Sequence, residues 1–516
     1  MSTDKSFINH HNHSVARSAG MISLATLSSR ILGFIRDIII ARLFGIYVYA
    51  QAFVIAFRIP NLFRDLVGEG ASNAAIVPVL SEYNHKRSKE EFWELANLLL
   101  NLAVVILSAI TILGIIFSPL IVRLIAPGFI AFPEKLQATI NLNRIIFPYI
   151  FLIGLAAYAM AVLNSLKNFT ISAFAPCLLN ISIIICALLL GEGTKGLATG
   201  VLLGGVLQLA VQIPLLYKKG FRPRVAFNFK HPGIVQIKKL LLPRLVSSSI
   251  YQLNNFVDTI FGSLIAIVGD GGVAVLYFAY RLIQFPIGIF SNAIAQAILP
   301  TFSTQVLEDN HDNLKHTLSW GLRTVFFVLM PMTALFMVLA KPLVFTFFGG
   351  GRFDFNSGVL TSSALFYYSI GLFAYGGTKI LQCCFFALKD TVTPTKIAGL
   401  ALFLNVALNA ILMFPLKIGG LALATSISGV ITFFVLFFIL SKRLGGFQEN
   451  KILFSFLRVC GATLGMAAVC FLVNRALNFY WALFCGGIAY IVFCFIFKVT
   501  ELKELTDKIL WQTYKI

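Results

Sequence analysis

Five arginines between residues 30 and 83 are the side chains of this sequence best suited to chemistry. Arg30, Arg36, Arg42, Arg58 and Arg64 stand within runs of Ile, Leu, Phe, Val and Ala. At the centre of a membrane helix each arginine costs about 2.5–3.5 kcal/mol to insert, so such a group favours a wet interior lined by protein. A guanidinium fork can bind two phosphate oxygens at once. The pattern therefore predicts an intramembrane cavity with surplus positive charge that receives an anion.

The acids of the same stretch are too few to neutralise these arginines. The acids that lie closest to the arginines in the sequence are Asp37, Asp65 and Glu69. Arg30 and Asp37 are seven residues apart and so lie on nearly one helix face, whereas Arg36 points about 120° away. The alternative to an anion site is a set of structural ion pairs that lock helices together, and it stays open for any one arginine.

Two further cations occur within apolar segments of the second half, Arg281 in YFAYRLIQFPIGIF and Lys379 in YGGTKILQCC. An ionisable residue inside a membrane span is by default a candidate for function. We expect both to line the same cavity. Lys379 would alternatively extend its ammonium group to the membrane surface.

A second polar group consists of Asp258, Asn405, Asn409 and Thr425. One carboxylate with amide and hydroxyl oxygens would suit a hard monovalent cation. The alternative is hydrogen bonding between helices, which polar residues commonly provide in membranes. Coupling to sodium or protons stays open, and no organic cofactor is expected.

Composition identifies a polytopic membrane protein. The 516 residues are 58% hydrophobic and 12% charged, with a mean hydropathy of +0.87, far from soluble globular composition. The net charge of +20 lies mainly in short loops and forms no continuous basic face, so nucleic acid is not an expected partner. No HExxH, Walker loop or carboxylate cluster indicates an enzyme, and the eight cysteines lie in apolar segments without metal-site spacing.

Hydropathy predicts an all-α protein with about fourteen transmembrane helices, since about 20 apolar residues cross a bilayer. The second and eighth predicted spans contain proline and glycine, which indicates bends or breaks. The expected spans are 19–43, 49–80, 92–124, 141–166, 170–190, 196–217, 241–267, 273–303, 319–347, 362–388, 395–414, 419–441, 452–473 and 477–498.

Loop charge orients the bundle. Lys and Arg gather in the loops after even-numbered spans, above all in 218–244, while loops such as GEGTKG and PLKIGG are poor in cations. Cations near span ends favour the cytoplasm, so both termini are predicted to be cytoplasmic. The loop 218–244 would alternatively touch anionic lipid headgroups.

A weak internal repeat divides the chain. Gly196-Leu197-Ala198 returns 224 residues later as Gly420-Leu421-Ala422, and Leu179-Asn180-Ile181 resembles Leu404-Asn405-Val406. Six spans in each half keep the two copies in one orientation. We expect two six-helix lobes, 1–220 and 221–445, around a central cavity, followed by two extra helices and a cytoplasmic tail in 446–516.

The sequence resembles the MurJ (MviN) family, the lipid II flippases of bacterial peptidoglycan synthesis, within the superfamily of multidrug and oligosaccharidyl-lipid exporters. The resemblance extends over essentially the whole chain. The similar motifs are Ser29-Arg30-x-Leu32-Gly33-Phe34-x-Arg36-Asp37, Ala41-Arg42-x-Phe44-Gly45, Pro60-Asn61-Leu62-x-Arg64, Glu69-Gly70-Ala71, Phe147-Pro148-Tyr149 and Ala173-Phe174-Ala175-Pro176.

This resemblance implies which residues meet the substrate. The diphosphate and sugar headgroup of lipid II, a polyprenyl-diphosphate-linked muropeptide, would contact Arg30, Arg36, Asp37, Arg64, Arg281 and Lys379. The last two helices would form a groove for the prenyl tail. The protein would lie in the inner membrane among its lipids as a monomer and serve cell-wall growth and cell shape.

Three positions depart from the pattern of this family. Gln51 and Gln284 replace acids that are frequent in relatives, and Asp65 replaces a second basic residue. These departures affect the expected ion coupling and leave the anion preference intact. The expected function is therefore a lipid II flippase working by alternating access. The alternatives are a multidrug/cation antiporter of the same architecture, which requires an acid-rich site, and a membrane scaffold without transport.

Overall fold

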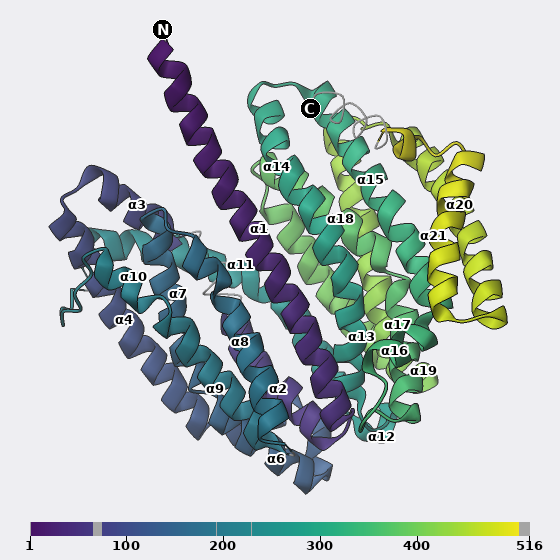
Figure 1. The fold of residues 1–516 in the computed structure, drawn as a ribbon, viewed down its shortest axis with the longest axis horizontal. Helices are drawn as coiled ribbons and strands as arrows, with labels where there is room; N and C mark the ends of the chain where they lie inside the picture. The colour runs from purple at the N-terminus through teal and green to yellow at the C-terminus, as the bar shows by residue number, and fades with distance from the viewer. Residues whose placement is uncertain (1, 65–74, 192, 229, 505–516) are drawn as a thin grey trace. The chain divides into compact units, whose positions relative to one another are not determined.

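The computed structural model describes residues 2–64, 75–191, 193–228 and 230–504, and these residues fold into helices with no β-strand among them (Figure 1). A helix satisfies every backbone hydrogen bond within one segment, as a lipid environment requires. Nine of the described helices are long and apolar enough to cross a membrane, or ten if the bent pair Phe355–Ser369 and Leu372–Ala387 forms one span. The predicted all-α membrane architecture is confirmed.

Within the described residues, each of the fourteen predicted spans overlaps with one or more helices. One long helix, Val392–Leu444, covers two of them and is broken at Lys417, whose φ is 51° and ψ −127°. The break falls in PLKIGG, where the sequence predicts a loop. A count of fourteen spans is consistent with this arrangement and stays a prediction.

The chain forms two compact units. Unit 1 contains residues 1–264 with 351–353, and unit 2 contains residues 265–350 and 354–516. These units are defined by packing, whereas the predicted lobes 1–220 and 221–445 rest on the sequence repeat. The lobe boundaries therefore stay a prediction.

Unit 1 is built from eleven described helices and one short 3-10 turn. Helix α8 packs against α9 and α1, α2 packs against α6, and α4 packs against α7. The bounds are α1 (Ser2–Phe44), α2 (Val48–Phe63), α3 (Val77–Lys86), α4 (Lys89–Ile116), α5 (Ser118–Ile125), η2 (Pro127–Ala131), α6 (Pro133–Ile146), α7 (Tyr149–Ser165), α8 (Thr170–Leu189), α9 (Thr194–Ala210), α10 (Ile213–Lys218) and α11 (Pro232–Gly262).

Unit 2 begins with a four-residue helix and ends with a helical pair. Helix α15 packs against α18 and α20, α17 packs against α13 and α19, and α20 packs against α21. The bounds are α12 (Ile265–Val268), α13 (Gly272–Pro286), η3 (Ile287–Ser291), α14 (Asn292–Leu307), α15 (His311–Val338), α16 (Ala340–Phe348), α17 (Phe355–Ser369), α18 (Leu372–Ala387), α19 (Val392–Leu444), α20 (Glu449–Ala476) and α21 (Phe479–Ile496).

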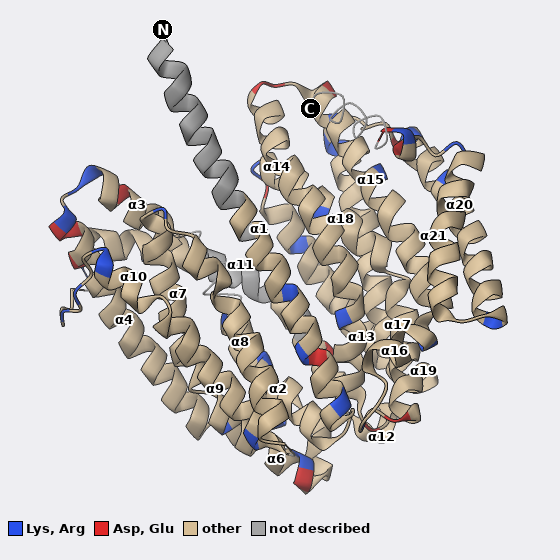
Figure 2. Ribbon diagram, viewed as in Figure 1, with Lys and Arg blue, Asp and Glu red and all other residues tan. Residues whose placement is uncertain are grey.

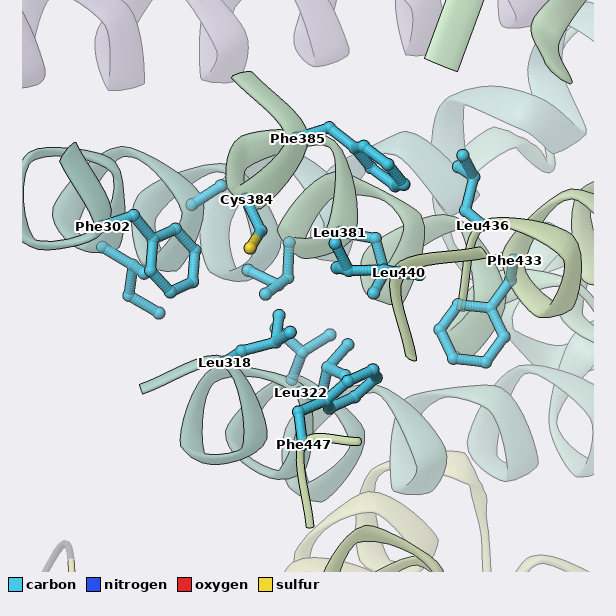
Figure 3. Packing of buried hydrophobic residues seen from close by; sticks show 14 of the residues in the cluster. Phe302, Leu318, Leu322, Leu381, Cys384, Phe385, Phe433, Leu436, Leu440 and Phe447 are labelled. Carbon is cyan, nitrogen blue, oxygen red and sulfur yellow. The ribbon is translucent and has the colours of Figure 1, made fainter. Parts of the chain in front are cut away.

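The core of unit 2 lies where α14, α15, α18 and α19 meet. Large apolar side chains from these helices point toward one another, among them Phe302, Leu322, Phe385 and Phe433 (Figure 3). Close packing of this kind drives association of membrane helices, because lipid tails are as apolar as the side chains themselves. The predicted extra helices α20 and α21 belong to this unit.

The eighth predicted span is interrupted as its proline indicates. Helix α13 ends at Pro286, the π-helical turn η3 follows, and α14 continues the segment. In the second span α2 contains Pro60 and ends at Phe63. The residues Asp65, Gly68, Glu69 and Gly70 lie outside the described residues.

Two helix ends in the two halves of the chain share a backbone conformation. Lys167 follows the end of α7 and Lys389 follows the end of α18, and their φ angles are 60° and 59°. After each lysine, the next N–H bonds to the carbonyl five residues back at 2.9 Å. The two lysines are 222 residues apart, close to the offset of the sequence motifs.

Candidate functional site

Most charged residues lie near helix ends, and the helix lengths are largely without charge (Figure 2). The exceptions include the cations that the sequence singles out, together with Arg323 on α15 and Arg458 on α20. The cations singled out from the sequence occur in both units.

In unit 1 the centre of the arginine group is a buried cluster formed by α1 and α8. Arg36 and Asp37 are 2% and 0% exposed. Arg36 donates from Nε and Nη2 to Asp37 Oδ1, at 3.0 and 2.7 Å, and from Nη1 to Asn180 Oδ1 at 3.1 Å. The Asn180 amide in turn donates to the carbonyl of Ser29 at 3.1 Å. The cluster joins α8 to the C-terminal half of α1.

An aromatic ring also faces this guanidinium. The Arg36 Cζ atom lies 5.8 Å from the ring centroid of Phe57 on α2, within the range of a cation–π contact. A buried charge persists only when it is paired and hydrogen-bonded. Arg36 is thus paired with an acid on its own helix and hydrogen-bonded to a second helix through Asn180, and its role in substrate binding stays a prediction.

The other arginines of this stretch are more accessible. Arg30 and Arg42 on α1 are exposed, and Arg58 and Arg64 on or just after α2 are half-buried. Of Asp37, Asp65 and Glu69, only Asp37 lies within the described residues. One buried pair therefore coexists with cations that keep access to the surface of unit 1.

In unit 2 the predicted cations lie on α13 and α18. Arg281 is half-buried, its Nη2 lies 3.3 Å from the Tyr277 hydroxyl and its Nη1 lies 3.4 Å from Gln284 Oε1. Its Cζ also lies 5.3 Å from the Tyr277 ring centroid. The Gln284 departure thus provides a neutral acceptor where an acid would neutralise the arginine. Lys379 is exposed on α18.

The second polar group is divided between the units. On α19, Asn405 donates to Thr425 Oγ1 and Asn409 donates to Asn405 Oδ1, both at 3.0 Å. All three are buried, and the bond between Asn405 and Thr425 joins the two halves of α19 across its break at Lys417. These contacts are the hydrogen bonding between helices given as the alternative. Asp258 lies half-buried on α11 in unit 1, and a cation role for the four residues stays a prediction.

Among the described residues, no group of three or more His, Cys, Asp or Glu side chains is arranged to hold a metal ion. All eight cysteines are free thiols, and five of them are buried. The chemistry that the described site residues offer is binding of charge by guanidinium, ammonium and amide groups.

Two features of the site were not assigned from the sequence. Asn180 appears there only as part of a repeat motif, although a lone amide in an apolar span signals a polar partner on another helix. The pairing of Arg323 on α15 with Glu501, at 2.6 Å, was also missed, because 178 residues separate the two.

Comparison with known proteins places the chain among transporters. The family model for "Lipid II flippase MurJ" matches residues 40–491. A probable lipid II flippase MurJ of Buchnera aphidicola subsp. Schizaphis graminum is 35% identical over 447 residues, 86% of each chain. A probable lipid II flippase MurJ of Vibrio cholerae is 34% identical and covers 82% of each chain.

Solved structures agree with this assignment. A lipid II flippase MurJ in an inward closed conformation has a TM-score of 0.81 at 28% identity and covers 94% of this chain and 99% of its own. An inward-facing multidrug transporter of the MATE family has a TM-score of 0.69 at 18% identity, which shows a shared fold. With the family model matched over most of its length, the chain belongs to the MurJ family of lipid II flippases.

Proposed function

We propose that this protein moves lipid II from the cytoplasmic to the outer leaflet of the bacterial inner membrane. It is a transporter and not an enzyme, since the family to which it belongs carries a lipid rather than converting it. The observation that carries the proposal is membership of this family together with cations set into apolar helices of both units. This excess of cations argues against the acid-rich site that an exporter of cationic drugs requires.

The headgroup is proposed to meet the accessible cations first. Arg30 on α1, Arg64 after α2, Arg281 on α13 and Lys379 on α18 offer donors for phosphate and sugar oxygens. Arg36 and Asp37 would hold α1 in position and exchange partners when a diphosphate arrives. A guanidinium suits this task because its planar fork matches two phosphate oxygens.

The return of the empty carrier is proposed to use charge. A net-positive site gains about 2.3 kcal/mol per charge for every 100 mV of membrane potential. Binding of sodium or a proton near Asp258, Asn405, Asn409 and Thr425 is the other route. Further parts of the proposal are cytoplasmic termini, action as a monomer, and a prenyl-tail groove on α20 and α21.

A reconstituted transport assay tests this function. Proteoliposomes carrying lipid II with a labelled headgroup report its arrival in the other leaflet. Loss of a hydrogen bond to a charged group costs about 1.5–3 kcal/mol, so we expect Arg30→Gln or Arg281→Gln to slow translocation about tenfold or more.

The matched control is Lys442→Gln, which removes an exposed cation from the end of α19. It should change the rate less than about twofold, in keeping with an exposed charge. If the wild-type protein moved no lipid II, the proposed function would be wrong. If it moved lipid II and neither arginine variant slowed it, only the assigned binding residues would be wrong.

A further inference from the structure

The basic linker, which we define as residues 218–230, joins α10 to α11 and is held against unit 1 by an aromatic anchor. Phe221 is 6% exposed. Its ring centroid lies 5.7 Å from that of Trp93 and 6.5 Å from that of Tyr158. The Tyr158 hydroxyl donates to the carbonyl of Ala96 at 2.8 Å, so the ring that receives Phe221 is itself fixed to α4.

Two asparagines on α4 then hold the backbone that follows. Asn97 Nδ2 donates to the carbonyl of Arg222 at 3.1 Å, and Asn97 Oδ1 accepts from the N–H of Arg224 at 2.7 Å. Asn101, one helical turn later, donates to the carbonyls of Arg224 and Ala226 at 2.7 and 3.0 Å. These four bonds involve only linker backbone, so they fix the segment without occupying its charged side chains.

The fixed linker presents cations and apolar groups outward together. Val225 is 85% exposed and Phe227 is 56% exposed. Nearby backbone holds the Arg222 side chain in place, because its guanidinium donates to the carbonyls of Tyr217 and Phe221. Within the described part of the chain no carboxylate forms an ion pair with the five exposed cations of the linker, which are Lys218, Lys219, Arg222, Arg224 and Lys230.

Three glutamates at the start of α4 do not neutralise the positive charge of the linker. Glu90, Glu91 and Glu94 stand in its first two turns. Glu91 lies 3.8 Å from Arg87, another cation of the same region. The linker therefore keeps a positive surface at the end of unit 1 that loop charge predicts to be cytoplasmic.

We propose that the basic linker is a preformed docking surface for the headgroups of anionic phospholipids in the cytoplasmic leaflet. Guanidinium and ammonium groups bind phosphate oxygens, and basic segments beside membrane spans are attracted to anionic lipids. The exposed Val225 and Phe227 would enter the boundary between headgroups and acyl chains, which removes them from water. Since Asn97 and Asn101 have already ordered the backbone, binding loses little conformational entropy.

Lipid binding to the whole protein in neutral detergent micelles tests the proposal without lipid II. Labelled phosphatidylglycerol is titrated, with labelled phosphatidylcholine as the lipid without net charge. Each cation near an anionic surface contributes about fivefold in affinity. Arg222→Gln/Arg224→Gln should therefore weaken phosphatidylglycerol binding at least about tenfold and leave phosphatidylcholine binding unchanged.

Two further variants distinguish a binding surface that depends on the ordered linker backbone from a non-specific effect of positive charge. Lys442→Gln/Lys451→Gln removes two exposed cations elsewhere and should change the affinity less than about twofold. Asn97→Ala/Asn101→Ala keeps all five cations but releases the linker backbone, and should weaken binding about threefold or more.

The proposal is overturned if the arginine pair has no effect, or if the lysine pair has an equal effect. Unchanged affinity in a folded asparagine variant would overturn the claim that the held backbone creates the surface. Displacement of phosphatidylglycerol by an equal concentration of inorganic phosphate would show a free-phosphate site in place of a lipid surface. None of these results bears on lipid II translocation, so the two proposals fail separately.

Discussion

At the scale of single residues, the buried pair of Arg36 and Asp37 shows how unit 1 tolerates charge inside an apolar helix. The guanidinium donates to a carboxylate, to the Asn180 amide oxygen, and faces the Phe57 ring. Desolvation of two charges is repaid only when the geometry is good and the remaining donors are satisfied. Asn180 thereby becomes a positioning residue, because it fixes where the arginine fork points.

Replacing only Asp37 should destabilise the fold more than replacing both Arg36 and Asp37. Asp37→Leu leaves a buried guanidinium without its carboxylate, and we expect about 3–5 kcal/mol of lost stability. Arg36→Met/Asp37→Leu replaces the pair by apolar groups and should recover most of that loss. Thermal unfolding in detergent measures both, and a double variant as unstable as the single one would contradict this account.

A second residue-scale prediction concerns pH. Asp390 lies between α18 and α19, where Oδ1 accepts from the N–H groups of Val392 and Thr393. Partial burial would raise its pKa, but the hydrogen bonds from Thr393 and the ion pair with Arg443 outweigh burial and lower the pKa below the usual value of an aspartate. A lowered carboxyl pKa stabilises the fold above the unfolded-state pKa and loses this effect as pH falls.

Asp390→Asn keeps an acceptor but removes the charge. We therefore expect the variant to have a free energy of unfolding about 1 kcal/mol lower than that of the wild type at pH 7. This gap in stability should close below about pH 4. Melting temperatures recorded down to about pH 3 measure the gap, and Arg443→Gln should show the same closing. A gap that is constant with pH would exclude the charge as its cause.

At the scale of elements, helix ends carry an unusual choice of residue. Lys167, Lys389 and Lys498 each have a φ between 52° and 60° at a helix C-terminus, the position where glycine is commonest. A side chain in this left-handed conformation costs about 1–2 kcal/mol relative to glycine.

Glycine and alanine substitutions at these ends remove the same charge. Lys389→Gly should therefore be about 1 kcal/mol more stable than Lys389→Ala, and the same order is expected at Lys167. Denaturation of the paired variants measures the difference. Equal stability of the glycine and alanine variants at one position would mean that the left-handed backbone conformation of that lysine does not lower the stability of the fold.

The sequence predicts elements better than contacts for a physical reason. Apolar runs of fixed length identify the spans, and proline marks the break after α13. Arg36 was expected to point away from its neighbours on α1, because helical geometry separates adjacent Cβ atoms. A long flexible side chain can still turn back onto Asp37, and Asn180 lies on a helix 144 residues later, so sequence alone does not identify it.

At the scale of the whole molecule, the last two helices are joined to the rest of unit 2 by apolar packing against α15 and by buried polar contacts. Glu501 is 2% exposed and accepts from Arg323 on α15 at 2.6 Å and from Ser455 on α20 at 2.8 Å. The Tyr490 hydroxyl on α21 donates to the carbonyl of Phe327 at 2.6 Å. The segment after α21 thus fixes α20 and α21 to α15, and residues 505–516 of the predicted cytoplasmic tail lie outside the described residues.

This attachment allows a test of the prenyl-tail groove proposed for α20 and α21. Glu501→Gln leaves the Arg323 guanidinium, 11% exposed, without its buried carboxylate, which costs several kcal/mol. Helices α20 and α21 should then exchange amide hydrogens faster, while the core around Phe302 and Phe385 keeps its protection.

Transport should respond in the same direction. If these helices guide the prenyl chain, Glu501→Gln slows lipid II with a full-length tail several-fold more than a short-tailed analogue. Glu504→Gln is the matched control, because that carboxylate is 41% exposed and 3.5 Å from the same arginine, where a pair contributes about 0–1 kcal/mol. Equal slowing of both lipids would assign α20 and α21 a structural role and remove the tail groove from the mechanism.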